Sequence, residues 1–247
     1  LLTAAGSELI SWLTAKKVLI VHAHQSSGSF NAAAKNAAVE VLTAQGCTVE
    51  VSDLYAMGFK ATAKAEDIKG EVKNADNFCY LEESKLAWEQ GKLSDDITKE
   101  QSKLTEADLI IFQFPMYWFS VPAILKGWID RVLTNGFAFS QDKRYSQGVF
   151  QDKKAMLSFT TGSLESMFSP TGINGDMNVT LWPLQNGIRT TVASRFWPLR
   201  SSGLPLLLQL KIARACWRVG AHACKAYWRK SLSPSFLWIV LMRRLSS

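Results

Sequence analysis

Residues 107–132, ADLIIFQFPMYWFSVPAILKGWIDRV, decide the fold of this chain. The run Asp108–Phe114 is short and apolar, which predicts a β-strand. Three consecutive aromatic residues follow in the loop 115–121. Pro122 then occupies a position that suits the first turn of a helix, so we expect a helix over 122–133. A strand followed by a loop and a helix is the repeating unit of a parallel α/β domain.

Strand and helix also alternate on either side of this stretch. Residues 18–21, VLIV, predict a strand buried on both faces of a sheet, and 31–45 predict an Ala- and Leu-rich helix that Gly46 ends. Residues 47–54 alternate as a second strand, and 154–160, KAMLSFT, predict a fourth. This order predicts an α/β fold with a doubly wound parallel sheet and helices on both faces.

Three loops follow these strands and are expected at the carboxyl edge of the sheet, where ligands bind in such folds. The loop His24–Asn31, HQSSGSFN, offers hydroxyl and amide groups at a helix start, which suits a phosphate, but it lacks the G-x-G-x-x-G pattern. The aromatic run 117–119 suits either a platform for a flat conjugated ring or a hydrophobic plug between subunits. The loop 160–163, TTGS, could offer backbone donors to the same ring.

Composition restricts the class of protein. The 247 residues, 47% hydrophobic and 20% charged, fit one globular domain, in which the polar residues 60–103 form a long excursion with helical patches. No apolar run reaches the roughly 18–20 residues that span a membrane. The four cysteines form no CxxC pair, which favours free thiols in an intracellular protein. Residues 1–15 lack a typical signal peptide and are interpreted as an extension of unknown role.

The segments quoted above, together with SDLYAM at 52–57 and GINGDMNVTLWPLQNGI at 172–188, resemble the NAD(P)H:quinone oxidoreductases. The resemblance covers residues 16–188, and FQFP-x-x-WF-x-VPAILKGW is its most distinctive part. It implies a flavodoxin-like fold and a homodimer that binds FAD at its interface. It also implies ping-pong, two-electron reduction of quinones by NAD(P)H or a dihydronicotinamide riboside. We expect a cytoplasmic enzyme, with neither nucleic acid nor membrane as a partner.

By position, the resemblance also assigns the residues of the site. The diphosphate and adenosine side of FAD would be bound by His24, Ser29, Phe30 and Asn31. The isoalloxazine ring would lie against Pro115, Met116, Tyr117, Trp118 and Phe119. The polar edge of the ring would contact Thr160, Thr161, Gly162 and Ser163. The substrate would be faced, from the partner subunit, by Phe139 and Gln141, and no metal ligands are expected.

Several positions depart from the family pattern. The NAD(P)H-using branch has a Tyr and a His that assist charge movement, and Phe168 and Asn174 occupy these catalytic positions here. Asn174 resembles the branch that prefers dihydronicotinamide riboside, whereas Phe168 has no hydroxyl group for proton assistance. Ser163 replaces the second glycine of the usual TTGG and is expected to crowd the flavin. Asn186 and Thr190 replace the histidines of a zinc-type site.

The last quarter of the chain differs in character from the rest. Residues 189–247 contain 11 of the 28 Lys and Arg residues and none of the 21 Asp and Glu residues, so residues 1–188 carry 17 basic and 21 acidic residues, a net charge of −4. Codons permitted for 189–198 can read HYCGFQVLA in a shifted frame, which resembles the family's fifth strand. We interpret 189–247 as an atypical basic tail that is out of frame. An unpaired sheet edge and weak flavin binding are therefore expected.

Two other functions stay open on the sequence alone. A non-catalytic chain could bind anionic membrane or nucleic acid through its basic tail, and salt-sensitive binding that is lost on deleting 189–247 would favour this function. Another flavodoxin-like reductase, such as an FMN azoreductase, would be distinguished by identifying the extracted cofactor. Among smaller features, His22, Trp128 and Trp182 are interpreted as structural residues.

Overall fold

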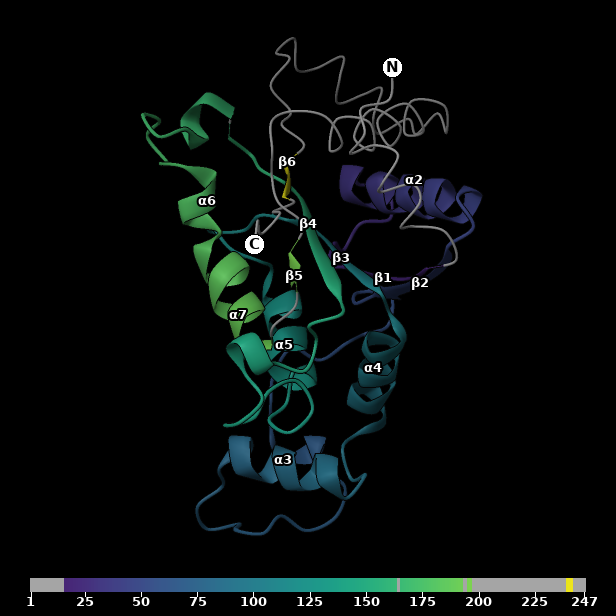
Figure 1. The fold of residues 1–247 in the computed structure, drawn as a ribbon, viewed down its shortest axis with the longest axis vertical. Coiled ribbons are helices and arrows are strands. Elements are labelled where there is room, and N and C mark those ends of the chain that lie inside the picture. Colours follow the sequence, from purple (N-terminus) through teal and green to yellow (C-terminus); the bar gives the residue numbers. More distant parts are fainter. Residues whose placement is uncertain (1–15, 164, 193–194, 197–238, 242–247) are drawn as a thin grey trace.

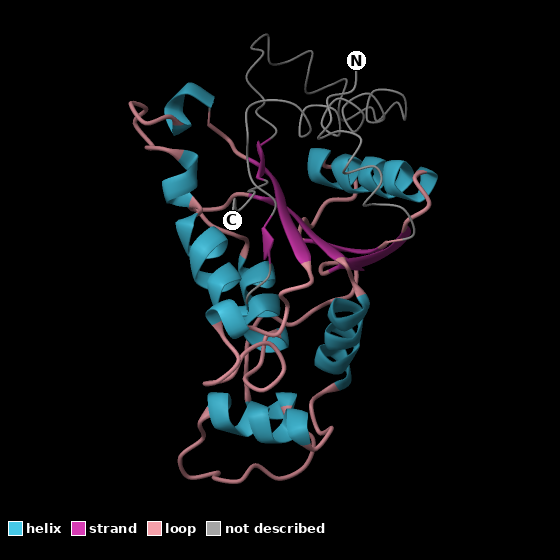
Figure 2. Cartoon of the chain, in the orientation of Figure 1, coloured by secondary structure: helices cyan, strands magenta, loops and turns pink. Residues whose placement is uncertain are grey.

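The computed structural model describes residues 16–163, 165–192, 195–196 and 239–241 (Figures 1 and 2). The predicted extension 1–15 and most of the basic tail lie outside these residues. The described strands form one sheet in the order β2-β1-β3-β4-β5. This is the strand order of flavodoxin-like, doubly wound folds. The predicted fold class is therefore confirmed.

The elements lie close to their predicted ranges. The strands are β1 (Lys17–His22), β2 (Thr48–Asp53), β3 (Leu109–Pro115), β4 (Lys154–Thr160), β5 (Arg195–Phe196) and β6 (Ile239–Leu241). The α-helices are α2 (Phe30–Ala44), α3 (Tyr80–Glu89), α4 (Asp95–Glu106), α5 (Ala123–Val132), α6 (Met177–Thr180) and α7 (Arg189–Val192). Shorter helical segments are η1 (Ala65–Asp67), η2 (Tyr145–Gln147), η3 (Glu165–Phe168) and the π-helical η4 (Pro183–Ile188).

Side chains of β1 alternate between two buried faces of the sheet. Val18 and Ile20 pack with residues of α2, whereas Leu19 and Val21 belong to a larger core that includes Leu125 of α5. Figure 1 shows α2 on one side of the sheet and α4 and α5 on the other. Because both faces of the strand are covered, its sequence is an unbroken apolar run rather than an alternating one.

The outer edge of β4 is paired, so the expected unpaired sheet edge was wrong. β5 runs parallel to β4 beside Lys154 and Ala155, and β6 runs antiparallel to it beside residues 157–159. Unpaired backbone N–H and C=O groups of a buried strand cost free energy, and the two short strands supply partners for them. The reading-frame interpretation of residues 189–247 stays a hypothesis, which a transcript covering these residues would test.

The excursion 60–103 contains helical patches, as predicted, namely η1, α3 and most of α4. Figures 1 and 2 show α3 at the end of the molecule farthest from α2. A small core of Ile68, Ala87, Leu93 and Ile97 holds this part together. One anchor to the domain is Arg131 of α5, whose buried guanidinium bonds Asp67 and Asp96 from within the excursion.

Candidate functional site

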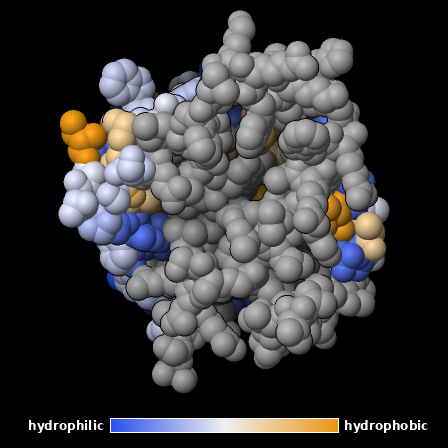
Figure 3. Space-filling view, turned by 90° about the horizontal axis from the view of Figure 1, so that it is seen from above, coloured by the Kyte–Doolittle hydropathy of each residue, from blue (hydrophilic) through white to orange (hydrophobic). Residues whose placement is uncertain are grey.

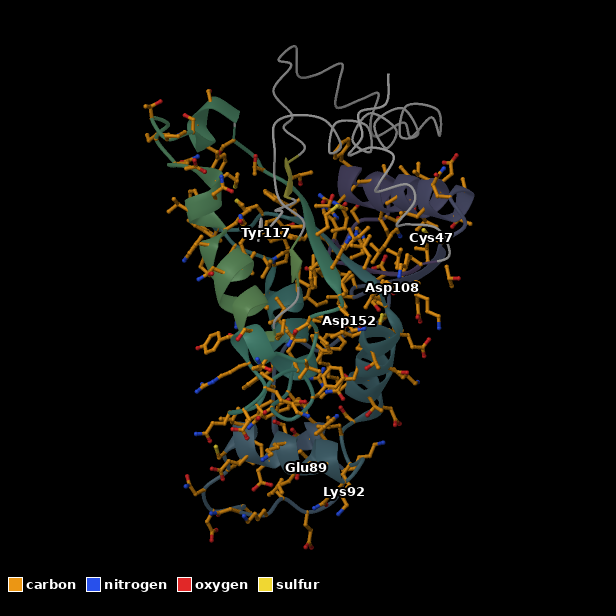
Figure 4. All side chains as sticks on the ribbon, viewed as in Figure 1. Cys47, Glu89, Lys92, Asp108, Tyr117 and Asp152 are labelled. Carbon is orange, nitrogen blue, oxygen red and sulfur yellow. The ribbon has the colours of Figure 1, made fainter. Side chains whose placement is uncertain are left out.

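The loops that follow β1, β3 and β4 meet at the carboxyl edge of the sheet. The backbone N–H of Met116 donates to the carbonyl of Thr160 over 2.8 Å, which joins the second loop to the third. The hydroxyl of Tyr117 lies 3.4 Å from the side-chain oxygen of Gln25 in the first loop. Figure 4 labels Tyr117 and Asp108 at opposite ends of β3, with Tyr117 at the carboxyl end. The predicted meeting of the three loops is confirmed.

An exposed aromatic turn dominates this edge. Tyr117 and Ser120 exchange two backbone hydrogen bonds of 3.0 Å, and the two residues between them, Trp118 and Phe119, both have positive φ angles, 49° and 62°. This is the pattern of a type I′ turn, which favours Asn-Gly and is strained with bulky residues. Trp118 is 94% exposed and Phe119 is 50% exposed. A strained turn that presents two aromatic rings to solvent is a feature typical of functional sites.

The start of α2 faces the same edge and is shaped by short polar contacts. Ser29 caps the helix, because its hydroxyl oxygen accepts a hydrogen bond from the backbone N–H of Ala32. The ring nitrogen Nδ1 of His24 accepts from the backbone N–H of Ser26 over 2.9 Å, and partial burial lowers the pKa of His24 below its ordinary value. Phe30 packs against the core beneath α2. The predicted phosphate loop is thus a formed turn at a helix N-terminus.

The third loop and Phe168 lie next to the aromatic turn. The hydroxyl of Thr161 donates to the carbonyl of Ser163 over 3.0 Å, and Gly162 between them is exposed. The ring of Phe168 packs edge-on against Phe119, with 6.2 Å between centroids. Phe168 is therefore brought to the predicted ring platform, although it offers no proton.

Three other predicted residues make their contacts away from the aromatic turn. The backbone N–H of Asn174 donates to the carbonyl of Met167, which closes the loop after η3. Phe139 packs against the core beyond α5, and Gln141 is exposed in the loop that follows. The roles assigned to Asn174, Phe139 and Gln141 stay predictions.

The predictions from sequence missed a row of polar side chains just beneath the edge. The strand register places His22 beside Asp53 on one side and Gln113 on the other, and Gln113 beside Ser158. Four neighbouring strands thus each place a polar residue in one line across the sheet. The only signal in the sequence was a polar residue near the end of each predicted strand, and its meaning depends on the register.

His22 is buried in this row, and its Nδ1 has no hydrogen-bond partner in the described structure. Burial lowers the pKa of His22 from 6.5 to about 4; Asp53 opposes this shift, while Lys35 and His24 add to it. A lowered folded-state pKa means that the unfolded chain binds the proton more readily. Stability is therefore fully present above pH 6.5 and is lost as the pH falls from there towards 4.

We expect this loss to disappear when His22 is replaced by leucine. The wild-type protein should lose about 2–3 kcal/mol more than His22→Leu between pH 6.5 and 4, because a tenfold difference in proton affinity between the folded and unfolded chains corresponds to about 1.4 kcal/mol. Urea unfolding at a series of pH values measures the difference. His24→Gln, which removes a less buried neighbouring histidine, should retain most of the wild-type slope. Parallel curves for wild type and His22→Leu would contradict the assignment.

Among the described residues, no helix is long and apolar enough to cross a membrane, and no group of three His, Cys, Asp or Glu side chains is arranged to hold a metal ion. What the described residues do form is a parallel sheet in flavodoxin order with an aromatic turn at its carboxyl edge. These features define a flavodoxin-like α/β protein.

Comparison with known proteins agrees with this class. The chain belongs to the flavodoxin-like fold family, whose model matches residues 16–203. It is 56% identical over 175 residues to ribosyldihydronicotinamide dehydrogenase [quinone] of Pongo abelii, covering 71% of this chain and 76% of that protein. It is 54% identical over 176 residues to NAD(P)H dehydrogenase [quinone] 1 of Rattus norvegicus, covering 71% and 64%.

Solved structures give the same result. A Klebsiella pneumoniae protein that is provisionally assigned as a quinone reductase superposes with a TM-score of 0.72 at 38% identity, covering 87% of this chain and 86% of that one. NAD(P)H:quinone oxidoreductase from Methanothermobacter marburgensis has a TM-score of 0.56 at 29% identity, covering 84% and 96%.

Proposed function

We propose that this chain is a quinone reductase that uses bound FAD to pass two electrons from NAD(P)H or dihydronicotinamide riboside to a quinone. The observation that carries the proposal is the strained, exposed turn at Trp118 and Phe119. The relatives that share more than half of their aligned residues with this chain are dehydrogenases of the quinone class. A flavin would supply the hydride chemistry, and the protein would supply binding, orientation and exclusion of water.

The residues present fit a flavin dinucleotide. The capped N-terminus of α2 and the turn at 24–29 offer backbone donors to a diphosphate, which helix N-termini favour. The rings of Trp118 and Phe119 offer the stacking surface, and the loop 160–163 lies within one hydrogen bond of it through Met116. These groups lie at one edge, so a single dinucleotide can contact all of them.

The side chains of Phe168 and Asn174 affect which group could donate a proton to the reduced product. Phe168 packs on Phe119 and carries no hydroxyl, so it closes one side of the platform without donating a proton. The side chain of Asn174 is a neutral amide, so it could orient a substrate oxygen by hydrogen bonding but could not take up charge. We therefore propose that solvent, rather than a protein acid, protonates the product.

We also propose a homodimer and a cytoplasmic location. Ile173, Val179 and Trp182 are 86%, 73% and 50% exposed on and near α6, and Figure 3 has hydrophobic residues at the surface on this side, at the left. Exposed apolar groups of this kind favour burial against a second subunit. Phe139 and Gln141 would then reach the partner's site. Among the described residues, Cys47 and Cys79 form no disulfide, which suits a reducing compartment.

The test is a titration of the purified full chain with FAD and with FMN, followed by turnover assays with a soluble benzoquinone. We expect FAD to bind more tightly than FMN, with quenched flavin fluorescence, and quinone reduction with dihydronicotinamide riboside, NADH or NADPH. Titration is preferred to measuring co-purified flavin, because weak retention during purification is expected. Saturable binding of FMN alone would redirect the proposal to an FMN reductase, and binding of neither flavin would remove it.

A further inference from the structure

Part of the polar row forms a chain of hydrogen bonds that begins and ends on β4. The hydroxyl of Ser158 donates to the side-chain oxygen of Gln113 over 2.7 Å. The amide nitrogen of Gln113 donates to Asn31 Oδ1 over 2.8 Å, and Asn31 Nδ2 donates to Thr160 Oγ1 over 2.9 Å. Three of these residues, Asn31, Gln113 and Ser158, are at most 5% exposed. The chain therefore joins α2, β3 and β4 through direct contacts between side chains.

Members of this chain belong to the two halves of the proposed cofactor site. Asn31 lies in the first turn of α2, next to the loop that would hold the diphosphate. Thr160 is the last residue of β4, and its carbonyl accepts the bond from Met116 at the base of the aromatic turn. Asn31 bonds Thr160 directly. Gln113, on the strand that leads into the aromatic turn, holds Asn31 through its amide nitrogen, while its side-chain oxygen accepts from Ser158.

We propose that Gln113 is a positioning residue, which holds the diphosphate loop and the ring platform at a fixed separation. The proposal rests on the proposed function, because it assumes a ligand that contacts both loops. Gln113 is 3% exposed and acts by fixing Asn31, which in turn bonds Thr160, rather than by touching the ligand. A ligand with two linked halves gains affinity from sites that are already correctly spaced, whereas each half alone gains nothing from the spacing.

The experiment compares the dissociation constants of FAD, riboflavin and ADP for the wild-type chain and for Gln113→Leu. Riboflavin carries the ring without a phosphate, and ADP carries the diphosphate and adenosine without the ring. Leucine removes both hydrogen bonds of the Gln113 side chain. We expect Gln113→Leu to weaken FAD by roughly 10- to 100-fold and each fragment by less than about three-fold, because only FAD depends on the spacing.

Gln101→Leu is the matched control. Gln101 is a buried glutamine on α4 whose amide donates to the carbonyl of Val132 and to the hydroxyl of Thr134, both over 3.0 Å. Its loss should lower stability in the same way but leave the ratio of FAD affinity to fragment affinity unchanged. Equal weakening of FAD and both fragments by Gln113→Leu, or an equal change of ratio in Gln101→Leu, would overturn the proposal.

Ser158→Ala provides a milder variant if Gln113→Leu does not fold. It removes only the donor to the oxygen of Gln113. The ratio of FAD affinity to fragment affinity should therefore fall, as in Gln113→Leu, but by only roughly 3- to 10-fold. An unchanged ratio in Ser158→Ala would then count against the proposal. Failure of the wild-type chain to bind FAD is a separate outcome, which would remove the proposed function rather than the role of Gln113 alone.

Discussion

Replacing Arg131 with methionine is expected to lower the free energy of unfolding by about 3–5 kcal/mol, because it leaves the buried carboxylate of Asp67 without its cation. The Arg131 guanidinium bonds Asp67 through Nε and an Nη at 2.9 and 2.7 Å, and reaches Asp96 through its other Nη at 2.7 Å. Burial alone would lower the pKa of Arg131, but the two carboxylates hold that pKa above its ordinary value. The hydroxyl of Tyr80 also bonds Asp67, so the loss spreads to α3.

Chemical unfolding of the wild type and of Arg131→Met measures this loss of stability. Lys126→Met is the control variant. Lys126 forms an exposed pair with Asp130 on the same helix, so its removal should cost less than about 0.5 kcal/mol. Adding Asp67→Asn to Arg131→Met should recover part of the stability, because a neutral amide is less costly to bury than an unpaired carboxylate. An Arg131→Met protein as stable as Lys126→Met would show that the ion pairs do not anchor the excursion.

Such a network could not be read from the sequence, although much of the fold could. The apolar runs at 18–21 and 154–160 identified strands, because a strand buried on both faces has a local signature. Arg131 and Asp67 lie 64 positions apart, and nothing in either neighbourhood marks the pairing. The excursion was predicted as a polar, helical region, but the contact that attaches it to α5 depends on the tertiary structure.

The candidate site likewise has features that the sequence predicted and features that it did not. The aromatic run at 117–119 predicted a ring platform from residue type alone, and the structure places it at the expected edge. Its turn geometry was not predictable, because Trp-Phe is not a sequence that favours positive φ. Gln113 and Ser158 were missed because a lone polar residue in a strand has no meaning until the register gives it a neighbour.

The turn itself leads to the second large effect, in which stability and binding change in opposite directions. Replacing Trp118 with asparagine and Phe119 with glycine gives the sequence that a type I′ turn prefers. Relief of backbone strain, less the entropy cost of glycine in the unfolded chain, should raise the free energy of unfolding by about 1–2 kcal/mol. Loss of both rings should weaken FAD by about 2–4 kcal/mol, or roughly 30- to 1000-fold in Kd.

Thermal unfolding without flavin and titration with FAD measure the two quantities on the same preparations. Tyr145→Gly is the matched control, because Tyr145 is another exposed aromatic residue with a positive φ angle, 56°, in the loop at η2. It should also gain stability, but its FAD affinity should equal that of the wild type. The opposite signs matter most, because damage to folding would lower stability and affinity together. A Trp118→Asn/Phe119→Gly protein that binds FAD normally would place the ring away from this turn.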